Sequence, residues 1–206
     1  MLTHREHEAF QDLAETGLLE TLRALAKMSN RQWCIFPQRM TLHLLDEALG
    51  IFPENEPARI GCDLRLEGAV DAHLLFLFPQ ESALTLTKFF TSGLSIPNTA
   101  EVQAMAVTEV SNILSNAFLN VLANTLKARF LAAEISPVSG PRGELLARIS
   151  GNMGKGRLLR TRLKMESEYL AMSADFCMLL DEESFSRILG LIDDCPACTV
   201  RRRRIF

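Results

Sequence analysis

The sequence has little of several features that would mark a specialised class of protein. Its 206 residues include only five cysteines, one tryptophan and one tyrosine, and the formal net charge is -3. Dispersed cysteines argue against a disulfide framework and fit a reducing compartment. A small negative charge argues against general nucleic-acid binding. We therefore predict a cytoplasmic protein that does not bind nucleic acid.

The chain also lacks the signals of membrane insertion, secretion and metal binding. No apolar run reaches the roughly 18 residues of a membrane span, and the first ten residues are charged and lack the apolar segment of a secretory signal. The few histidines show no ligand spacing apart from His4 and His7. We expect no membrane span and neither a metal nor a cofactor bound by this chain. The 48% hydrophobic content can supply the core of one compact domain.

The hydrophobic pattern predicts a similar order of elements twice. Each half is expected to contain a long helix, a short strand, an irregular or helical stretch, a hairpin and a closing helix. In the first half the long helix falls at 8–28, the short strand at 33–36, the irregular or helical stretch at 38–49, the hairpin at 58–67 with 71–78, and the closing helix at 79–90. In the second half the same elements fall at 99–127, 128–135, 140–149, 158–165 with 168–180, and 181–192.

The repeated order indicates an internal duplication. The blocks FLFPQESALTLTKFF and MLLDEESFSRILGLI match in pattern at an offset of 102 residues, and Pro37 and Pro137 lie 100 apart. Coincidence of two strand–helix units is the alternative. We predict a single α+β domain with a pseudo-two-fold axis, repeats at 8–92 and 99–192, and a flexible tail at 193–206. Its mixed or antiparallel sheet should carry long helices packed on one face.

The candidate site lies in the stretch from Thr108 to Leu126. Glu109 and Asn112 are spaced i and i+3, so they lie one turn apart on the same side of the predicted helix. A carboxylate beside a carboxamide can hold a cation and orient a water molecule. The alternative is a solvated helix face. Asn116 and Asn120 fall in the same arc, and we assign them to solvation or partner contact rather than catalysis.

These residues resemble the CheC, CheX and FliY family of chemotaxis phosphatases. That family carries Asp or Ser, three residues, Glu, two residues, Asn, and then about 22 residues before a Pro. Here Glu109-Val110-Ser111-Asn112 matches the core of the motif, and the block LFLFPQESALTLTKFF is typical of the family. The first position is Met105 instead, and residues 113–136, twenty-four of them, precede Pro137.

The resemblance implies a CheC-like fold, a substrate and a role for each matched residue. The substrate is the phosphorylated aspartate of a CheY-like receiver domain, which holds Mg²⁺ in its own acidic pocket. Asn112 would orient the attacking water, and Glu109 would pair with the receiver's lysine. The resemblance thus implies an aspartyl-phosphate phosphatase, a hydrolase of two-component signalling.

The first half carries an altered copy of the motif. Glu8, Asp12 and Glu15 fall on the three motif positions, and 21 residues separate Glu15 from Pro37. A carboxylate at the Asn position cannot donate an amide N–H. We predict that this first site is inactive.

Two other interpretations and two terminal motifs remain open. The chain could be a non-catalytic adaptor that binds a receiver domain or a CheD-type deamidase, or a switch component like FliY.

The Cys195–Cys198 pair is either two free thiols in a terminal loop or a redox motif. The run Arg201–Arg204 is either a disordered tail or a contact for an acidic partner or membrane surface.

Overall fold

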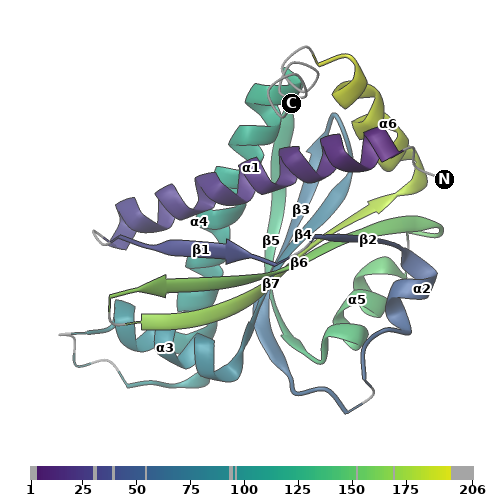
Figure 1. Cartoon of the computed structure of the whole chain (residues 1–206). Helices are drawn as coiled ribbons and strands as arrows, with labels where there is room; N and C mark the ends of the chain where they lie inside the picture. The colour runs from purple at the N-terminus through teal and green to yellow at the C-terminus, as the bar shows by residue number, and fades with distance from the viewer. Residues whose placement is uncertain are drawn as a thin grey trace.

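The computed structural model describes residues 4–29, 32–38, 40–53, 55–92, 95, 97–151, 153–168 and 170–195. In chain order its helices and strands are α1(His4–Ser29), β1(Cys34–Pro37), β2(Thr41–Leu44), α2(Leu45–Leu49), β3(Arg59–Gly68), β4(Ala72–Pro79), α3(Gln80–Phe90), α4(Ala100–Leu126), β5(Phe130–Gly140), α5(Arg142–Ser150), β6(Gly156–Ser167), β7(Leu170–Asp181) and α6(Glu182–Asp193). Figure 1 shows these elements along the chain. Within these ranges, no helix combines the length and apolar character needed to cross a membrane.

All seven strands of the described chain form one sheet, and every pairing is antiparallel. The order is β1-β6-β7-β4-β3-β5, and β2 also pairs with β6. Both predicted hairpins are present as β3–β4 and β6–β7. The predicted α+β class with an antiparallel sheet is therefore confirmed.

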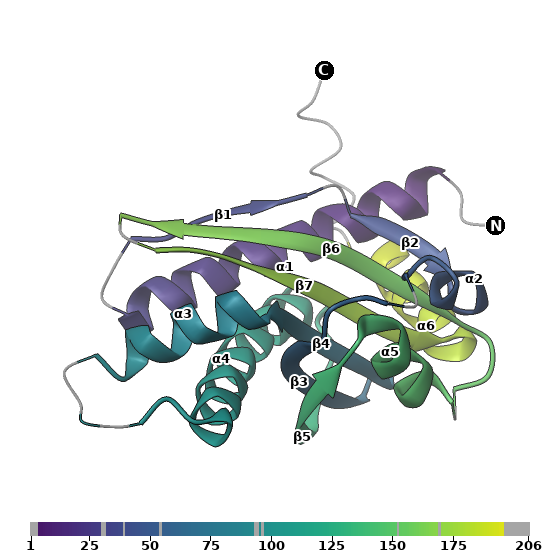
Figure 2. The same ribbon diagram turned by 90° about the horizontal axis from the view of Figure 1, so that it is seen from below.

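The central strands are buried on both faces, and their alternating side chains separate two cores. Leu74, Phe76 and Phe78 of β4 face a large core that also contains apolar side chains of α1, α3, α4 and α6. Leu75 and Leu77 face a smaller core under α2 and α5. The long helices thus lie on one face, as predicted, and two short helices cover part of the other. Figure 2 shows α2 and α5 close together, away from α4.

The two halves of the chain exchange their outer strands. β1 and β2 of the first half pair with β6 of the second, whereas β5 of the second half pairs with β3 of the first. The two hairpins meet where β4 pairs with β7. This reciprocal pairing and the repeated element order fit a pseudo-two-fold arrangement, while its origin in a duplication stays a prediction.

Three parts of the structure differ from the predicted elements. Strand β5 continues through Pro137 to Gly140, whereas the predicted strand ends at residue 135. The stretch 38–49, expected to be helical or irregular, contains strand β2, whose Thr41 is the partner of Arg160, followed by α2. At the other end, α6 continues to Asp193, and buried Cys195 donates a hydrogen bond from Sγ to the Thr125 carbonyl at 3.2 Å. Residues 193–195 of the predicted tail thus belong to the described structure, and the flexibility of the tail stays a prediction. Residues 196–206, with Cys198 and Arg201–Arg204, lie outside the described residues.

Strand β5 contains a β-bulge between Asn112 and Pro137. Arg65 of β3 is the partner of Glu134, but the next residue, Leu66, is the partner of Ala132. Ala133 therefore has no counterpart on β3, which is the extra residue of a bulge. Beyond the bulge, Pro137 lies opposite Cys62 on this edge strand, where a residue without an N–H is tolerated.

Helices α1 and α4 cross in close contact at a glycine. A Cβ atom at Gly17 would lie 2.4 Å from Cδ2 of Phe118 and 2.6 Å from Cε2. The Phe118 ring in turn packs on Phe176 of β7, with ring centroids 4.9 Å apart. The missing side chain at position 17 therefore lets α1 approach α4, while Phe118 fixes α4 on the centre of the sheet. Figure 1 shows the crossing.

We expect Gly17→Ala to lower the free energy of unfolding by about 1–3 kcal/mol, because the added methyl group overpacks the crossing. Gly190→Ala in α6 is the matched control, since a Cβ there would have no neighbour within 4 Å. That control should gain about 0.5–1 kcal/mol from helix propensity alone. Urea unfolding of both variants measures the difference. An equal rise in the free energy of unfolding of the two variants would contradict the close crossing of α1 and α4.

Candidate functional site on helix α4

Helix α4 has well-defined ends. The Thr99 hydroxyl caps its start by accepting a hydrogen bond from the Val102 amide at 3.3 Å, and Glu101 lies in the first turn, where a carboxylate complements the helix dipole. The helix ends at Lys127, which adopts a left-handed conformation with φ 53°. Ala100–Leu126 therefore matches the predicted helix closely.

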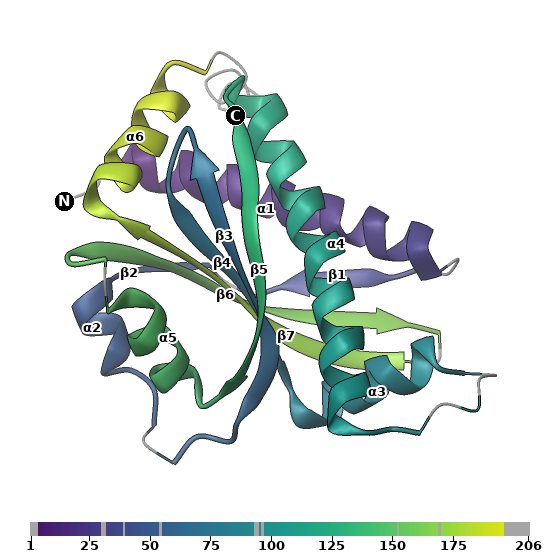
Figure 3. The same cartoon turned by 180° about the vertical axis from the view of Figure 1, so that it is seen from behind.

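The buried side of α4 fixes the position of the candidate residues. Val107, Val110, Leu114 and Phe118 are almost fully buried in the large core. Figure 3 shows α4 running beside β5, with α3 near its first turns. Buried Gln103 links these helices, because its Oε1 accepts from Gln80 Nε2 at 3.0 Å. The helix that carries the candidate pair is thus held by side chains along its length.

The opposite side of α4 presents the predicted pair to solvent. Glu109 is exposed and Asn112 is half-buried, one turn apart. Glu109 forms no ion pair with any cation of the described chain. Met105, one turn before Glu109, is 72% exposed. The structure therefore brings Glu109 and Asn112 together on an accessible face, beside an apolar side chain at the first motif position.

Asn112 is hydrogen-bonded to a neighbour to which we had assigned no such role. Asn116 Nδ2 donates to Asn112 Oδ1 at 2.6 Å and to the Asn112 backbone carbonyl at 2.9 Å. No described residue accepts a hydrogen bond from Asn112 Nδ2. The i, i+4 spacing of two amide side chains was the available sequence signal for this contact.

The altered motif of α1 lies on a separate helix. Glu8 and Asp12 are exposed and Glu15 is half-buried. Glu15 Oε1 accepts a hydrogen bond from Gln11 Nε2 at 2.9 Å. The structure thus places acceptor groups at all three positions, without an amide donor where the motif has Asn. The prediction that this copy is inactive remains untested.

The polar groups on α4 can bind and orient a substrate or a water molecule. Glu109 offers a negative charge, and the Asn112 amide offers N–H donors to a phosphoryl oxygen or a water molecule. Among the described residues, no three His, Cys, Asp or Glu side chains gather in a way that could hold a metal ion.

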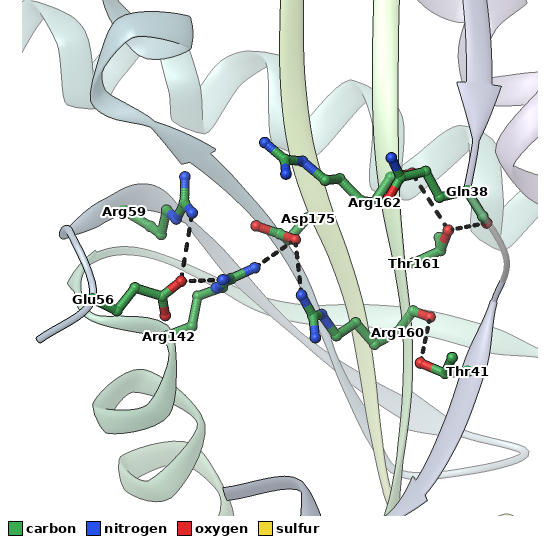
Figure 4. A network of polar contacts seen from close by, with 9 residues as sticks. All are labelled: Gln38, Thr41, Glu56, Arg59, Arg142, Arg160, Thr161, Arg162 and Asp175. Atoms are coloured by element: carbon green, nitrogen blue, oxygen red, sulfur yellow. Dashed lines mark hydrogen bonds and ion pairs between the residues drawn. The ribbon is translucent and has the colours of Figure 1, made fainter. Parts of the chain in front are cut away.

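A buried ionic network, which we did not predict, lies on the other face of the sheet. Figure 4 shows Arg142 between Glu56 and Asp175, with Arg59 and Arg160 at the two ends. Arg142 Nη1 lies 2.8 Å from Asp175 Oδ1, and Arg142 also pairs with Glu56. Arg160 lies 3.6 Å from Asp175, which is only 2% exposed. The network ties α5 and the loop before β3 to central strand β7.

Two ionisable groups of this network favour their charged forms. Burial by itself would raise the pKa of Glu56, but the hydrogen bond and charge of Arg142, together with Arg59, hold it below the ordinary value. Burial likewise opposes the charge on Arg142, yet Glu56 and Asp175 raise its pKa. Both groups are therefore charged at neutral pH, and the network is structural rather than a source of acid–base chemistry.

The buried cysteines of the sheet are also unreactive. Burial, with a contribution from Asp63, raises the pKa of Cys62 to about 12. Burial and Asp175 raise the pKa of Cys177 to about 12. Thiols with such values do not form the reactive thiolate at neutral pH. Neither residue is a candidate nucleophile.

The fold described here is the CheC-like fold. Its features are the antiparallel sheet with exchanged outer strands and the two long helices on one face. The resemblance inferred from the sequence is thus confirmed at the level of the fold. No protein-family model matches the sequence, and no curated protein does.

Three solved structures show this likeness. FliY from Thermotoga maritima has a TM-score of 0.68 and 10% identity, covering 93% of this chain and 97% of that chain. The FliM middle domain from H. pylori has a TM-score of 0.62 and 7% identity, covering 92% and 99%. CheX from Desulfovibrio desulfuricans has a TM-score of 0.53 and 14% identity, covering 81% and 99%. At these identities the likeness establishes the fold, and function must be argued from the site.

Proposed function

We propose that this protein is a phosphatase that accelerates hydrolysis of the aspartyl phosphate of a CheY-like receiver domain. The observation that carries the proposal is the accessible pair on α4: Glu109, exposed and without a cationic partner in the described chain, one turn before Asn112. This pair matches the motif of the chemotaxis phosphatases, and it lies in the fold that CheX and FliY share.

Phosphoryl transfer to water suits a helix that offers only two polar groups. Such a reaction needs positioning and charge stabilisation more than covalent help from the protein. The receiver would supply Mg²⁺, a lysine and the phosphorylated aspartate. Glu109 would pair with that lysine and set the docking register, while Asn112 would orient the attacking water in line with the phosphorus. Helix α4, held by its buried face, would enter the partner's active site as a rigid element.

The direct test follows the loss of acyl phosphate from purified, phosphorylated receiver domains. Each receiver is incubated with Mg²⁺, with and without this protein. The protein is added at a lower molar concentration than the receiver. We expect repeated turnover with at least one receiver. Unchanged hydrolysis in every receiver that binds the protein would refute the phosphatase proposal.

A second candidate is a binding module without catalysis, which would hold a receiver domain or a CheD-type deamidase. The observation in its favour is Met105, an apolar and largely exposed residue where the motif has Asp or Ser. The likeness to the FliM middle domain shows that this fold also occurs outside the CheX and FliY proteins. Tight binding of a phosphorylated receiver without faster hydrolysis would support this candidate.

A salt-dependent defect is expected for Glu109→Gln. The change keeps the shape of the side chain and removes its charge, so the pair with the partner's lysine is lost. A charge-assisted pair contributes about 1.5–3 kcal/mol, so affinity at low salt should fall roughly tenfold to a hundredfold. The defect should shrink as ionic strength rises, because salt screens the wild-type attraction.

The measurement is a titration with a stable mimic of the phosphorylated receiver at low and high salt. Glu101→Gln is the control, since Glu101 is an exposed carboxylate two turns earlier on the same helix. That variant should bind as the wild type does. Equal affinities for wild type and Glu109→Gln at low salt would rule out the ion pair.

A further inference from the structure

We infer that Asn116 is a positioning residue that fixes the orientation of the Asn112 side-chain amide, an inference that rests on the proposed function. The side-chain amide of an asparagine can turn over, which exchanges its donor nitrogen and acceptor oxygen. The two orientations present opposite groups to a partner. A residue that selects one of them therefore controls what Asn112 can do.

The contacts of Asn116 select a single orientation. Its Nδ2 lies 2.9 Å from the backbone carbonyl of Asn112. Because a carbonyl only accepts hydrogen bonds, this contact identifies the nearer end of the Asn116 amide as its nitrogen. The same nitrogen lies 2.6 Å from the side-chain amide of Asn112, which must therefore present Oδ1. The two hydrogens of one NH₂ group thus satisfy both acceptors.

The selected orientation leaves Nδ2 and one lone pair of Oδ1 of Asn112 available to a partner. Its Nδ2 donates to no described residue, and its Oδ1 retains a second lone pair. The nitrogen can donate to a phosphoryl oxygen or to the attacking water. A hydrogen bond accepted by Oδ1 also polarises the amide and strengthens its N–H groups as donors. Asn116 therefore acts through Asn112 and need not touch the substrate.

The other asparagines of α4 serve as matched controls. Asn120 and Asn124 continue the exposed face of the helix, and neither hydrogen-bonds to Asn112. All three positions are exposed sites of the same residue type on one helix. A general effect of removing an asparagine should therefore appear at all three, and a positioning effect only at Asn116.

The kinetic experiment measures receiver dephosphorylation at limiting and saturating phosphorylated receiver. Asn116→Ala should lower kcat about three- to tenfold, the range for one side-chain hydrogen bond, with KM nearly unchanged. Asn116→Asp should lower kcat further, because its carboxylate cannot donate and attracts Asn112 Nδ2 in place of Oδ1. Asn116→Gln, which keeps the donor on a longer stem, should recover part of the rate. Asn120→Ala should match the wild type.

A double substitution separates positioning from a direct or structural role. If Asn116 acts through Asn112, then adding Asn116→Ala to Asn112→Ala should cause no further loss of kcat. A further loss of the same size in the Asn112→Ala background would overturn the inference. So would an Asn116→Ala protein with wild-type kcat, and in that case the phosphatase proposal would stand on the Asn112 result alone.

A measurement of the free protein tests the orientation without any activity. The Asn112 side-chain NH₂ signals in ¹⁵N-labelled wild-type protein should show restricted motion on the picosecond to nanosecond timescale. In Asn116→Ala they should become as mobile as those of Asn120 and Asn124. An unchanged Asn112 signal would overturn the inference. A folded wild type that never accelerates hydrolysis would refute the phosphatase proposal instead, while this signal would still decide the orientation.

Discussion

Asn112→Ala should remove most of the receiver dephosphorylation that the wild-type protein stimulates, while leaving its fold and its receiver binding largely intact. The expected loss is roughly tenfold to a thousandfold, the range for removing one positioned polar group from a transition state. The fold should persist because Asn112 is a half-buried polar residue on the outer side of α4. Single-turnover hydrolysis at saturating protein measures this loss directly, and the thermal midpoint of unfolding reports the fold.

Two further variants make this result specific to the second half of the chain. Asn120→Ala, on the same exposed face, should keep wild-type activity. A double change of Asp12 and Glu15 to Ala should also leave activity nearly unchanged, since neither residue can donate the amide hydrogen bond. Full activity in Asn112→Ala would refute the assignment. Loss of activity in the Asp12 and Glu15 variant as complete as in Asn112→Ala would show that α1 carries a working site.

Asp175→Ala should be the most destabilising of the changes considered for this protein. Asp175 is 2% exposed and lies 2.8 Å from Arg142 and 3.6 Å from Arg160. Its removal leaves Glu56 as the one carboxylate of the network, paired with Arg59 and Arg142, and leaves Arg160 without its partner. Removing one partner from a buried ion pair costs about 3–5 kcal/mol. Chemical unfolding should therefore show a large fall in the midpoint concentration of denaturant.

The comparison with two other acidic positions tests the cause of this loss. Asp175→Asn keeps the shape and one acceptor, so its loss should be smaller, about 1.5–3 kcal/mol for a charged hydrogen bond. Asp193→Ala, at an exposed position near the end of α6, should change stability by less than about 0.5 kcal/mol. Because the network and α4 lie on different faces of the sheet, folded Asp175→Asn should retain its specific activity. A stable Asp175→Ala protein would contradict the role given to the network.

The parts of the fold that depend on local patterns could be predicted from the sequence. Alternating apolar residues identified both hairpins, and a continuous helical period identified α4 to within one or two residues of its ends. Strand β2 was missed because its four alternating residues, TLHL, are too few to distinguish a strand from a helical stretch. Thr41–Leu44 is extended because it pairs with Arg157–Arg160 of β6, a contact far along the chain.

The candidate site shows the same division between local and long-range information. The spacing of Glu109 and Asn112 fixed their common face, because three residues on a helix make nearly one turn. The accessibility of that face in the folded protein could not be read from the spacing alone. It depends on how α4 packs on the sheet and on the other helices. The buried network could have been suspected from Asp175, a lone carboxylate inside an apolar strand. Its partners, Glu56 and Arg142, come from a loop and a short helix whose positions only the folded sheet determines.

The exchange of outer strands between the halves has a consequence for how the chain folds. Neither half can complete its part of the sheet alone, because Cys34 of β1 must find Glu166 of β6, and Arg65 of β3 must find Glu134 of β5. Pairings so distant in sequence carry a large loop-closure entropy before they gain any contact energy, which slows folding. During synthesis on the ribosome, the first-half hairpin would have an unpaired edge at β4 until β7 emerges. Productive folding should therefore begin late and involve both halves together.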